Sequence, residues 1–177
     1  MALTIRSFAG FVLAAGAVVL ATVLLAQYWG GLAPCELCLW QRWPWAAAVT
    51  IAIVALFAGR APALPWVAAL LAILFAASAA LAFYHVGVEQ HWFAGPQTCT
   101  AGAGSGATTV AELKRQLLGV APVLCDRIAW SLFGISLAGW NLLASLLMAL
   151  CCAAVLRRAR PPAGDPSPRH GARRGAA

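Results

Sequence analysis

Two cysteines separated by two residues lie between long apolar stretches, with an arginine four residues after the second. The stretch PCELCLWQRWPW, residues 34–45, contains Cys35, Cys38 and Arg42. A Cys-x-x-Cys pair can alternate between a dithiol and a disulfide, and a nearby guanidinium stabilises a thiolate or another anion. On a helix these three residues would stand at i, i+3 and i+7 and share one face. The pattern predicts thiol–disulfide chemistry beside a fixed charge, although Arg42 alone could simply extend to a membrane surface.

The residues around this pair predict a helix that starts beside the first cysteine. Pro34 cannot continue a helix from upstream but suits a helix start. Backbone N–H groups and the helix dipole would then favour a thiolate at Cys35. Pro44 removes a helical hydrogen bond, so we expect a kink close to the pair. Covalent haem attachment is excluded, because Leu39 stands where a Cys-x-x-Cys-His motif requires histidine.

Four further cysteines fall into two groups. Cys99 and Cys125 lie in the hydrophilic segment 87–127, and a disulfide between them would be exposed and exchangeable. Two alternatives stay open from the residues alone: a zinc site formed by Cys35, Cys38, Cys99 and Cys125, or a membrane protein with static disulfides. Cys151 and Cys152 lie at the end of an apolar run, where buried cysteines usually serve as apolar packing.

The composition predicts that membrane helices position these residues. Of 177 residues, 63% are hydrophobic and 10% are charged, and the mean hydropathy is +0.84. Such a chain has too little charge for the surface of a soluble domain. Four stretches lack charged residues and are long enough to cross a bilayer. We therefore expect an all-α membrane protein, an up-and-down bundle of four transmembrane helices near residues 8–28, 39–58, 64–86 and 129–156.

The first of these segments could be a signal peptide, since Arg6 precedes a long apolar run. The run is long for a signal peptide, and Gln27-Tyr28-Trp29 suits a membrane interface. We therefore expect a retained helix. Residues 1–156 then form one transmembrane redox domain with outer loops near 29–38 and 87–127, and residues 157–177 form a basic, disordered tail.

The distribution of Lys and Arg predicts the orientation. Cytoplasmic loops are enriched in these residues. With both termini in the cytoplasm, eight of the 12 lie inside and four lie outside, the latter being Arg42, Lys114, Arg115 and Arg127. The net charge of +7 then reflects membrane insertion, and no nucleic-acid partner is expected. The four cysteines of the candidate site face a compartment that permits disulfides.

Polar residues at three further places in the sequence suggest a structural or functional role. Thr109 and Glu112 have capping-box spacing, and an apolar stripe from Val110 to Leu117 predicts a short helix on the membrane surface, or a loop helix without lipid contact. His85 lies in an apolar run, where an ionisable group suggests function, although a buried hydrogen-bonded histidine is the alternative. Asn141 is expected to form a hydrogen bond between helices.

The ordered set of these features resembles the DsbB family, bacterial inner-membrane proteins of disulfide bond formation. The resemblance covers roughly residues 5–156. It consists of four helices, a Cys-x-x-Cys pair before the second helix with Gln41-Arg42 behind it, and two single cysteines in the last outer loop. Proteins similar to vitamin K epoxide reductase use the same parts, but their Cys-x-x-Cys follows the loop pair.

The resemblance implies a reaction and assigns the site residues. A Cys99–Cys125 disulfide would reoxidise a periplasmic dithiol protein similar to DsbA, with Cys99 forming the mixed disulfide. Cys125 would then exchange with Cys35, and the Cys35–Cys38 pair would pass two electrons to a membrane quinone, ubiquinone or menaquinone. Arg42 and His85 match positions that contact the quinone in that family. The resemblance assigns no resident metal.

Overall fold

The computed structural model describes residues 4–96, 98–100, 109–111, 114 and 123–159. Its long helices are α1 (Ile5–Tyr28), α3 (Arg42–Ala58), α4 (Leu64–Glu89) and α6 (Leu137–Ala159). A five-residue helix α2 (Glu36–Trp40) precedes α3, and a 3₁₀ turn η1 (Ala61–Ala63) precedes α4. With α2 and α3 counted as one span, the described residues contain 4 helices long and apolar enough to cross a membrane. The predicted all-α membrane architecture is confirmed.

The second span is interrupted at Gln41, three residues before Pro44. Proline has no N–H, so Pro44 cannot donate to the carbonyl of Trp40 as a helical residue would. The chain forms a turn at Gln41, and α3 begins at Arg42. The expected kink therefore divides the span into α2, which contains Cys38, and α3, which starts with Arg42.

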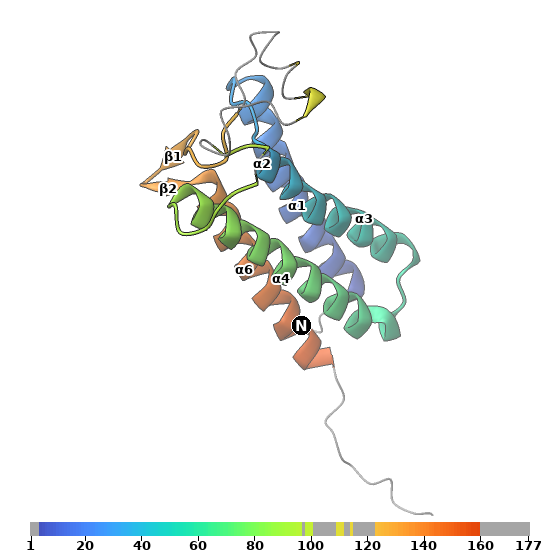
Figure 1. Ribbon diagram of the computed structural model, residues 1–177. Coiled ribbons are helices and arrows are strands. Elements are labelled where there is room, and N and C mark those ends of the chain that lie inside the picture. Colours follow the sequence, from blue (N-terminus) through green and yellow to red (C-terminus); the bar gives the residue numbers. More distant parts are fainter. Residues whose placement is uncertain (1–3, 97, 101–108, 112–113, 115–122, 160–177) are drawn as a thin grey trace, which may run out of the picture.

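The helices pack as two antiparallel pairs, α1 along α3 and α4 along α6, and α3 joins the pairs through α4 (Figure 1). The middle of the bundle is filled by apolar side chains, among them Phe8, Trp45, Phe75 and Cys152. The Trp45 and Phe75 rings meet edge to face with centroids 5.0 Å apart. Cys152 is fully buried in this core and Cys151 is partly buried, as expected for apolar packing.

The last span begins later than the sequence suggested. The prediction of helix from residue 129 was wrong, because β1 (Ser131–Leu132) and β2 (Ile135–Ser136) form an antiparallel hairpin there. Its turn contains Phe133 and Gly134, both with positive φ. Ser136 then accepts a hydrogen bond from the Gly139 N–H, which caps the first turn of α6. Because most residues of this segment are apolar, the sequence pattern did not indicate the turn.

Both described ends of the bundle lie at the end opposite the hairpin (Figure 1). This arrangement follows from four antiparallel spans. Most of the expected surface helix lies outside the described residues, although Val110, Ala111 and Lys114 are helical and exposed. Of the predicted tail, Arg157 and Arg158 belong to the last turn of α6, and residues from 160 onward lie outside the described part.

A glycine in α1 permits close packing against α3. A Cβ added at Gly16 would lie 2.6 Å from Cγ2 of Val49, whereas a Cβ at Gly10 would meet nothing within 4 Å. We expect Gly16→Val to lower the free energy of unfolding by about 1–3 kcal/mol, the usual cost of overpacking. Thermal unfolding in detergent measures this, with Gly10→Val as the control in the same helix. Equal losses in the two variants would contradict the packing role of Gly16.

Candidate functional site

Four cysteines from three separate segments meet at the hairpin end of the bundle. Cys35, Cys99 and Cys125 are buried together with Leu37 and Val88, and Cys38 is half-buried at the edge of the same group. We refer to these six residues as the cysteine cluster. Residues separated by up to 90 positions in the sequence are thus packed into one site.

The loop cysteines form a disulfide. Cys99 and Cys125 are joined with an S–S distance of 2.07 Å and a Cα–Cα distance of 5.3 Å. Cys99 is 3% exposed and Cys125 is 0% exposed. The expectation of an exposed disulfide was therefore wrong, because the bond packs on Leu37 and Val88 instead of facing water.

The Cys-x-x-Cys residues are thiols with their sulfur atoms in contact. The two Sγ atoms are 3.0 Å apart. Cys35 is the N-cap residue of α2, and its sulfur accepts a hydrogen bond from the Cys38 N–H at 3.3 Å. Such a position stabilises negative charge on sulfur. The predicted helix start is therefore present, with Cys35 as the cap and Pro34 just before it.

The two cysteine pairs are held together by a contact between their neighbours. The Thr98 hydroxyl donates to the Glu36 carboxylate. Thr98 precedes Cys99, and Glu36 follows Cys35, so this bond links the disulfide segment to the first turn of α2. It keeps the disulfide over the thiol pair.

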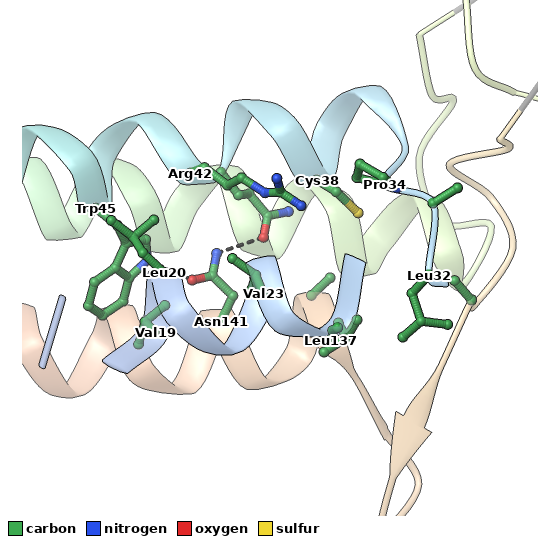
Figure 2. A pocket seen from close by; sticks show the side chains of 15 residues that line it. Val19, Leu20, Val23, Leu32, Pro34, Cys38, Arg42, Trp45, Leu137 and Asn141 are labelled. Atoms are coloured by element: carbon green, nitrogen blue, oxygen red, sulfur yellow. Dashed lines mark hydrogen bonds between the residues drawn. The ribbon is translucent and has the colours of Figure 1, made fainter. Parts of the chain in front are cut away.

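A pocket on one side of the cysteine cluster contains Arg42. It lies between α1, the α2–α3 junction and α6, with about 660 Å³ of empty space that includes its open mouth. Figure 2 shows Cys38 and Arg42 on the same wall, with Leu137 and Asn141 of α6 across from them. Most of the lining is apolar. Arg42 donates to the side-chain oxygen of Gln27 at 2.7 Å, which holds its head group at the pocket.

The predicted common face of Cys35, Cys38 and Arg42 is only partly present. Cys38 and Arg42 line this Arg42 pocket, but Cys35 lines a smaller cavity together with His85 and Glu89. Cys35 differs because it is a cap and not a helical residue. Cys38 lines both cavities and so lies between them.

His85 contacts a cysteine and does not line the Arg42 pocket. Its Nε2 is 3.5 Å from the Cys35 sulfur and 4.0 Å from Oε1 of Glu89, and its side chain is buried. The Ser136 hydroxyl donates to Glu89 and fixes that carboxylate. Arg42 and His85 therefore line different cavities that meet at Cys38, and each contacts a different partner.

A chain of hydrogen-bonded side chains contacts His85 at Nδ1, the ring nitrogen that does not face Cys35. The Trp45 indole N–H donates to Oδ1 of Asn141 at 2.8 Å, and Nδ2 of Asn141 donates to Oε1 of Gln41 at 2.6 Å. Nε2 of Gln41 lies 2.6 Å from Nδ1 of His85. We call these four residues the amide chain. The expected interhelical hydrogen bond of Asn141 is present, while the buried Gln41 was not anticipated as a site residue.

The surroundings of Cys35 lower its pKa well below that of an ordinary thiol. The largest cause is the hydrogen bond with the Cys38 side chain, and burial opposes it. The hydrogen bond with the His85 side chain and the one from the Cys38 N–H lower the pKa further. Cys38, Glu89 and Arg127 complete the titratable and charged groups of the small cavity. The N-cap position and these hydrogen bonds therefore favour a thiolate at Cys35 in the reduced pair.

This assignment predicts an acid titration of the reduced protein. Because the folded pKa is lowered to about 4, the thiolate should persist at neutral pH and be lost as the pH falls through that value. The ultraviolet absorbance of the thiolate measures it. Cys35→Ser should remove this acid step, and a step that survived in Cys35→Ser would assign the thiolate to another cysteine.

The four-thiolate zinc site is not formed in this structure, because Cys99 and Cys125 are bonded to each other. Within the described residues, the ligand atoms of Cys35, Cys38 and His85 lie within 4.8 Å of one another. These three could in principle bind a soft metal ion.

One known protein family matches most of the chain. The family model described as disulfide bond formation protein DsbB matches residues 5–155. Searches of curated proteins and of solved structures found no match. The matched range includes three spans, most of the fourth and all four cysteines of the cluster.

Proposed function

The chain belongs to the DsbB family, and from this membership we propose that it reoxidises a periplasmic dithiol protein and passes the electrons to a membrane quinone. Membership implies an oxidoreductase of disulfide bond formation in a multi-pass membrane protein. The dithiol partner, the quinone and the roles of single residues are the proposed part.

One observation carries the proposal: a formed disulfide and a thiol pair share one buried cluster beside an apolar pocket. Thiol–disulfide exchange requires sulfur atoms that can come into line with each other. Cys99–Cys125 packs directly in the cluster with Cys35, and Cys38 borders the pocket. This order of groups suits electrons that enter at the loop disulfide and leave at the pocket.

The first half of the proposed reaction transfers two electrons from the partner. A partner thiolate attacks Cys99, which breaks the Cys99–Cys125 bond and releases Cys125 as a thiolate. The partner's second thiol then attacks the mixed disulfide and releases Cys99. The partner leaves oxidised, and the loop pair is left as two thiols.

The second half restores the loop disulfide. With Cys35–Cys38 as a disulfide, the Cys125 thiolate attacks Cys35 and releases Cys38, and Cys99 then attacks Cys125 and releases Cys35. The loop pair is oxidised again, and Cys35 and Cys38 are left as the thiol pair described above. Each exchange forms one S–S bond and breaks one, so electrons balance.

The residues of the Arg42 pocket fit a quinone head group. Its lining is mainly apolar with a few polar groups, as the linings of small-ligand sites usually are. A bound quinone would supply an acceptor for the two electrons and two protons that the thiol pair loses when it becomes a disulfide. Arg42 would offer a fixed positive charge to a reduced head group, and Cys38 would present its sulfur in the same pocket.

The structure supports a different role for His85 from the quinone contact that the family resemblance implied. Since His85 contacts Cys35, we propose that it stabilises the sulfur from the smaller cavity. In this role His85 assists the release of Cys35 during exchange.

Purified protein mixed with a reduced periplasmic dithiol protein and a quinone tests the function directly. We expect quinone absorbance to fall as partner disulfide appears, one for one. Quinone reduction by the dithiol partner that proceeded equally without this protein, or no reduction with it, would contradict the proposal. A static structural membrane protein would show the second result.

We also propose an orientation in the bacterial inner membrane, with both termini cytoplasmic and the cysteine cluster periplasmic. The excess of Lys and Arg at the terminal end of the bundle supports it. A reporter fused after Arg60 should show a cytoplasmic location, and one fused after Gln90 a periplasmic location. The reverse pattern would place the cysteines in the reducing cytosol and exclude the proposed reaction.

A further inference from the structure

The direction of the hydrogen bonds in the amide chain fixes which nitrogen of His85 holds its proton. The chain starts at the Trp45 indole, which can only donate a hydrogen bond. Its acceptor in Asn141 must therefore be the oxygen, so the Asn141 nitrogen faces Gln41. That nitrogen donates to the Gln41 oxygen, so the Gln41 nitrogen faces His85.

At the end of the chain, Nδ1 of His85 receives a hydrogen bond and must be bare. The proton of the neutral ring is then on Nε2, which points to the Cys35 sulfur at 3.5 Å, with Glu89 at 4.0 Å. The chain joins α3, α6 and α4, and Trp45, Gln41 and His85 are each at most 6% exposed. Asn141 is half-buried and lines the Arg42 pocket, so the bond between Gln41 and His85 is the part of the chain that is shielded from solvent.

Local rotation cannot remove this constraint. If Gln41 turned its oxygen toward His85, its nitrogen would face the nitrogen of Asn141, and both groups only donate. If Asn141 turned as well, its nitrogen would face the indole N–H. Each amide flip moves the pair of facing donors one residue along the chain. Because the indole at the end of the chain can only donate, no combination of flips removes this pair. A proton on Nδ1 would thus leave two buried donors facing each other.

We propose that Gln41, held by Asn141 and Trp45, is a positioning residue that keeps the ring proton of His85 on Nε2, so that His85 donates to the Cys35 sulfur and is a poor ligand for a metal ion. Its benefit to turnover rests on the proposed function, but the tautomer does not.

The same direction of hydrogen bonding disfavours the binding of a metal ion by Cys35, Cys38 and His85. A metal ion on Nε2 requires a bare Nε2, and the ring proton then moves to Nδ1. Metal-bound histidines usually donate that second N–H to a carboxylate or a carbonyl group. Here the second nitrogen faces an amide N–H instead. The thiol pair can thus become reduced beside a histidine without forming a good zinc site.

Gln41→Glu replaces the amide donor that faces His85 with an acceptor and changes the shape of the side chain little. A carboxylate accepts hydrogen bonds from both sides, so it suits a proton on Nδ1. We expect reduced Gln41→Glu to gain a proton on Nδ1 and to bind Zn²⁺ roughly 10- to 100-fold more tightly than the wild-type chain, the range that such outer partners contribute. Gln27→Glu is the matched control, since Gln27 contacts Arg42 and not His85.

Nitrogen NMR of the histidine rings in the full, reduced wild-type protein is the primary test, with the His85 signals assigned by their loss in His85→Phe. A protonated Nε2 and a bare Nδ1 at neutral pH are expected. A proton on Nδ1 in the wild type, or an unchanged tautomer and unchanged Zn²⁺ affinity in Gln41→Glu, would overturn the proposal. In a His85→Phe background Gln41→Glu should no longer tighten Zn²⁺ binding, and equal tightening there would also overturn it. A wild type with the expected tautomer but no quinone reduction would contradict only the proposed function.

Discussion

Arg42→Ala is expected to slow quinone reduction by about 30- to 1000-fold while the protein stays folded and the Cys99–Cys125 disulfide forms normally. Arg42 contributes a fixed charge to a largely apolar pocket, where uncompensated negative charge is costly. Loss of one preorganised donor of this kind costs roughly 2–4 kcal/mol at the transition state. Stopped-flow absorbance of the quinone at saturating reduced partner measures the rate.

Two variants define what such a result means. Arg42→Lys should recover only part of the rate, because lysine lacks the planar fork that also bonds Gln27. Arg158→Ala removes the same charge from an exposed position in the last turn of α6 and should leave the rate unchanged. An Arg42→Ala rate within about twofold of wild type would show that Arg42 only extends to the membrane surface.

Cys99→Ser is expected to abolish both mixed-disulfide formation with the dithiol partner and steady-state turnover. Without Cys99 the loop disulfide cannot form, and Cys125 has no partner to complete its exchange with Cys35. Non-reducing electrophoresis after mixing with a partner that lacks its resolving cysteine measures the trapped complex. Activity with quinone measures turnover.

Cys151→Ser is the matched control for Cys99→Ser. Cys151 is a free, partly buried thiol in the last turns of α6, at the end opposite the cysteine cluster. Turnover should stay near the wild-type value. Trapping of the partner by Cys99→Ser at the wild-type level would mean that electrons enter at another cysteine.

The four spans and the two cysteine pairs could be predicted from the sequence because their signals are local. Charge-free runs of sufficient length mark the spans, and a proline three residues beyond Gln41 marks the break in the second span. The hairpin before α6 was missed because Leu132, Phe133 and Ile135 are as apolar as a membrane helix. Only Gly134 and the capping Ser136 signalled the turn.

The relations across the bundle could not be predicted, because they depend on how helices rotate against one another. Sequence spacing placed Cys35 and Arg42 on one face, whereas the break at Gln41 and the capping role of Cys35 separated them. An amide in an apolar segment was the available signal for Gln41. Its partner Asn141 is 100 residues away, and nothing local in the sequence pairs them.

The burial of the loop disulfide limits the kinetics of the proposed cycle. An outside thiolate must reach Cys99 along the axis of the S–S bond, yet Leu37, Val88 and the Thr98–Glu36 contact hold that bond against α2. Attack from outside therefore requires a unimolecular opening step, whereas exchange with Cys35 requires the closed arrangement. One molecule therefore cannot carry out the two half-reactions at the same time. Raising the partner concentration then accelerates turnover only up to the opening rate.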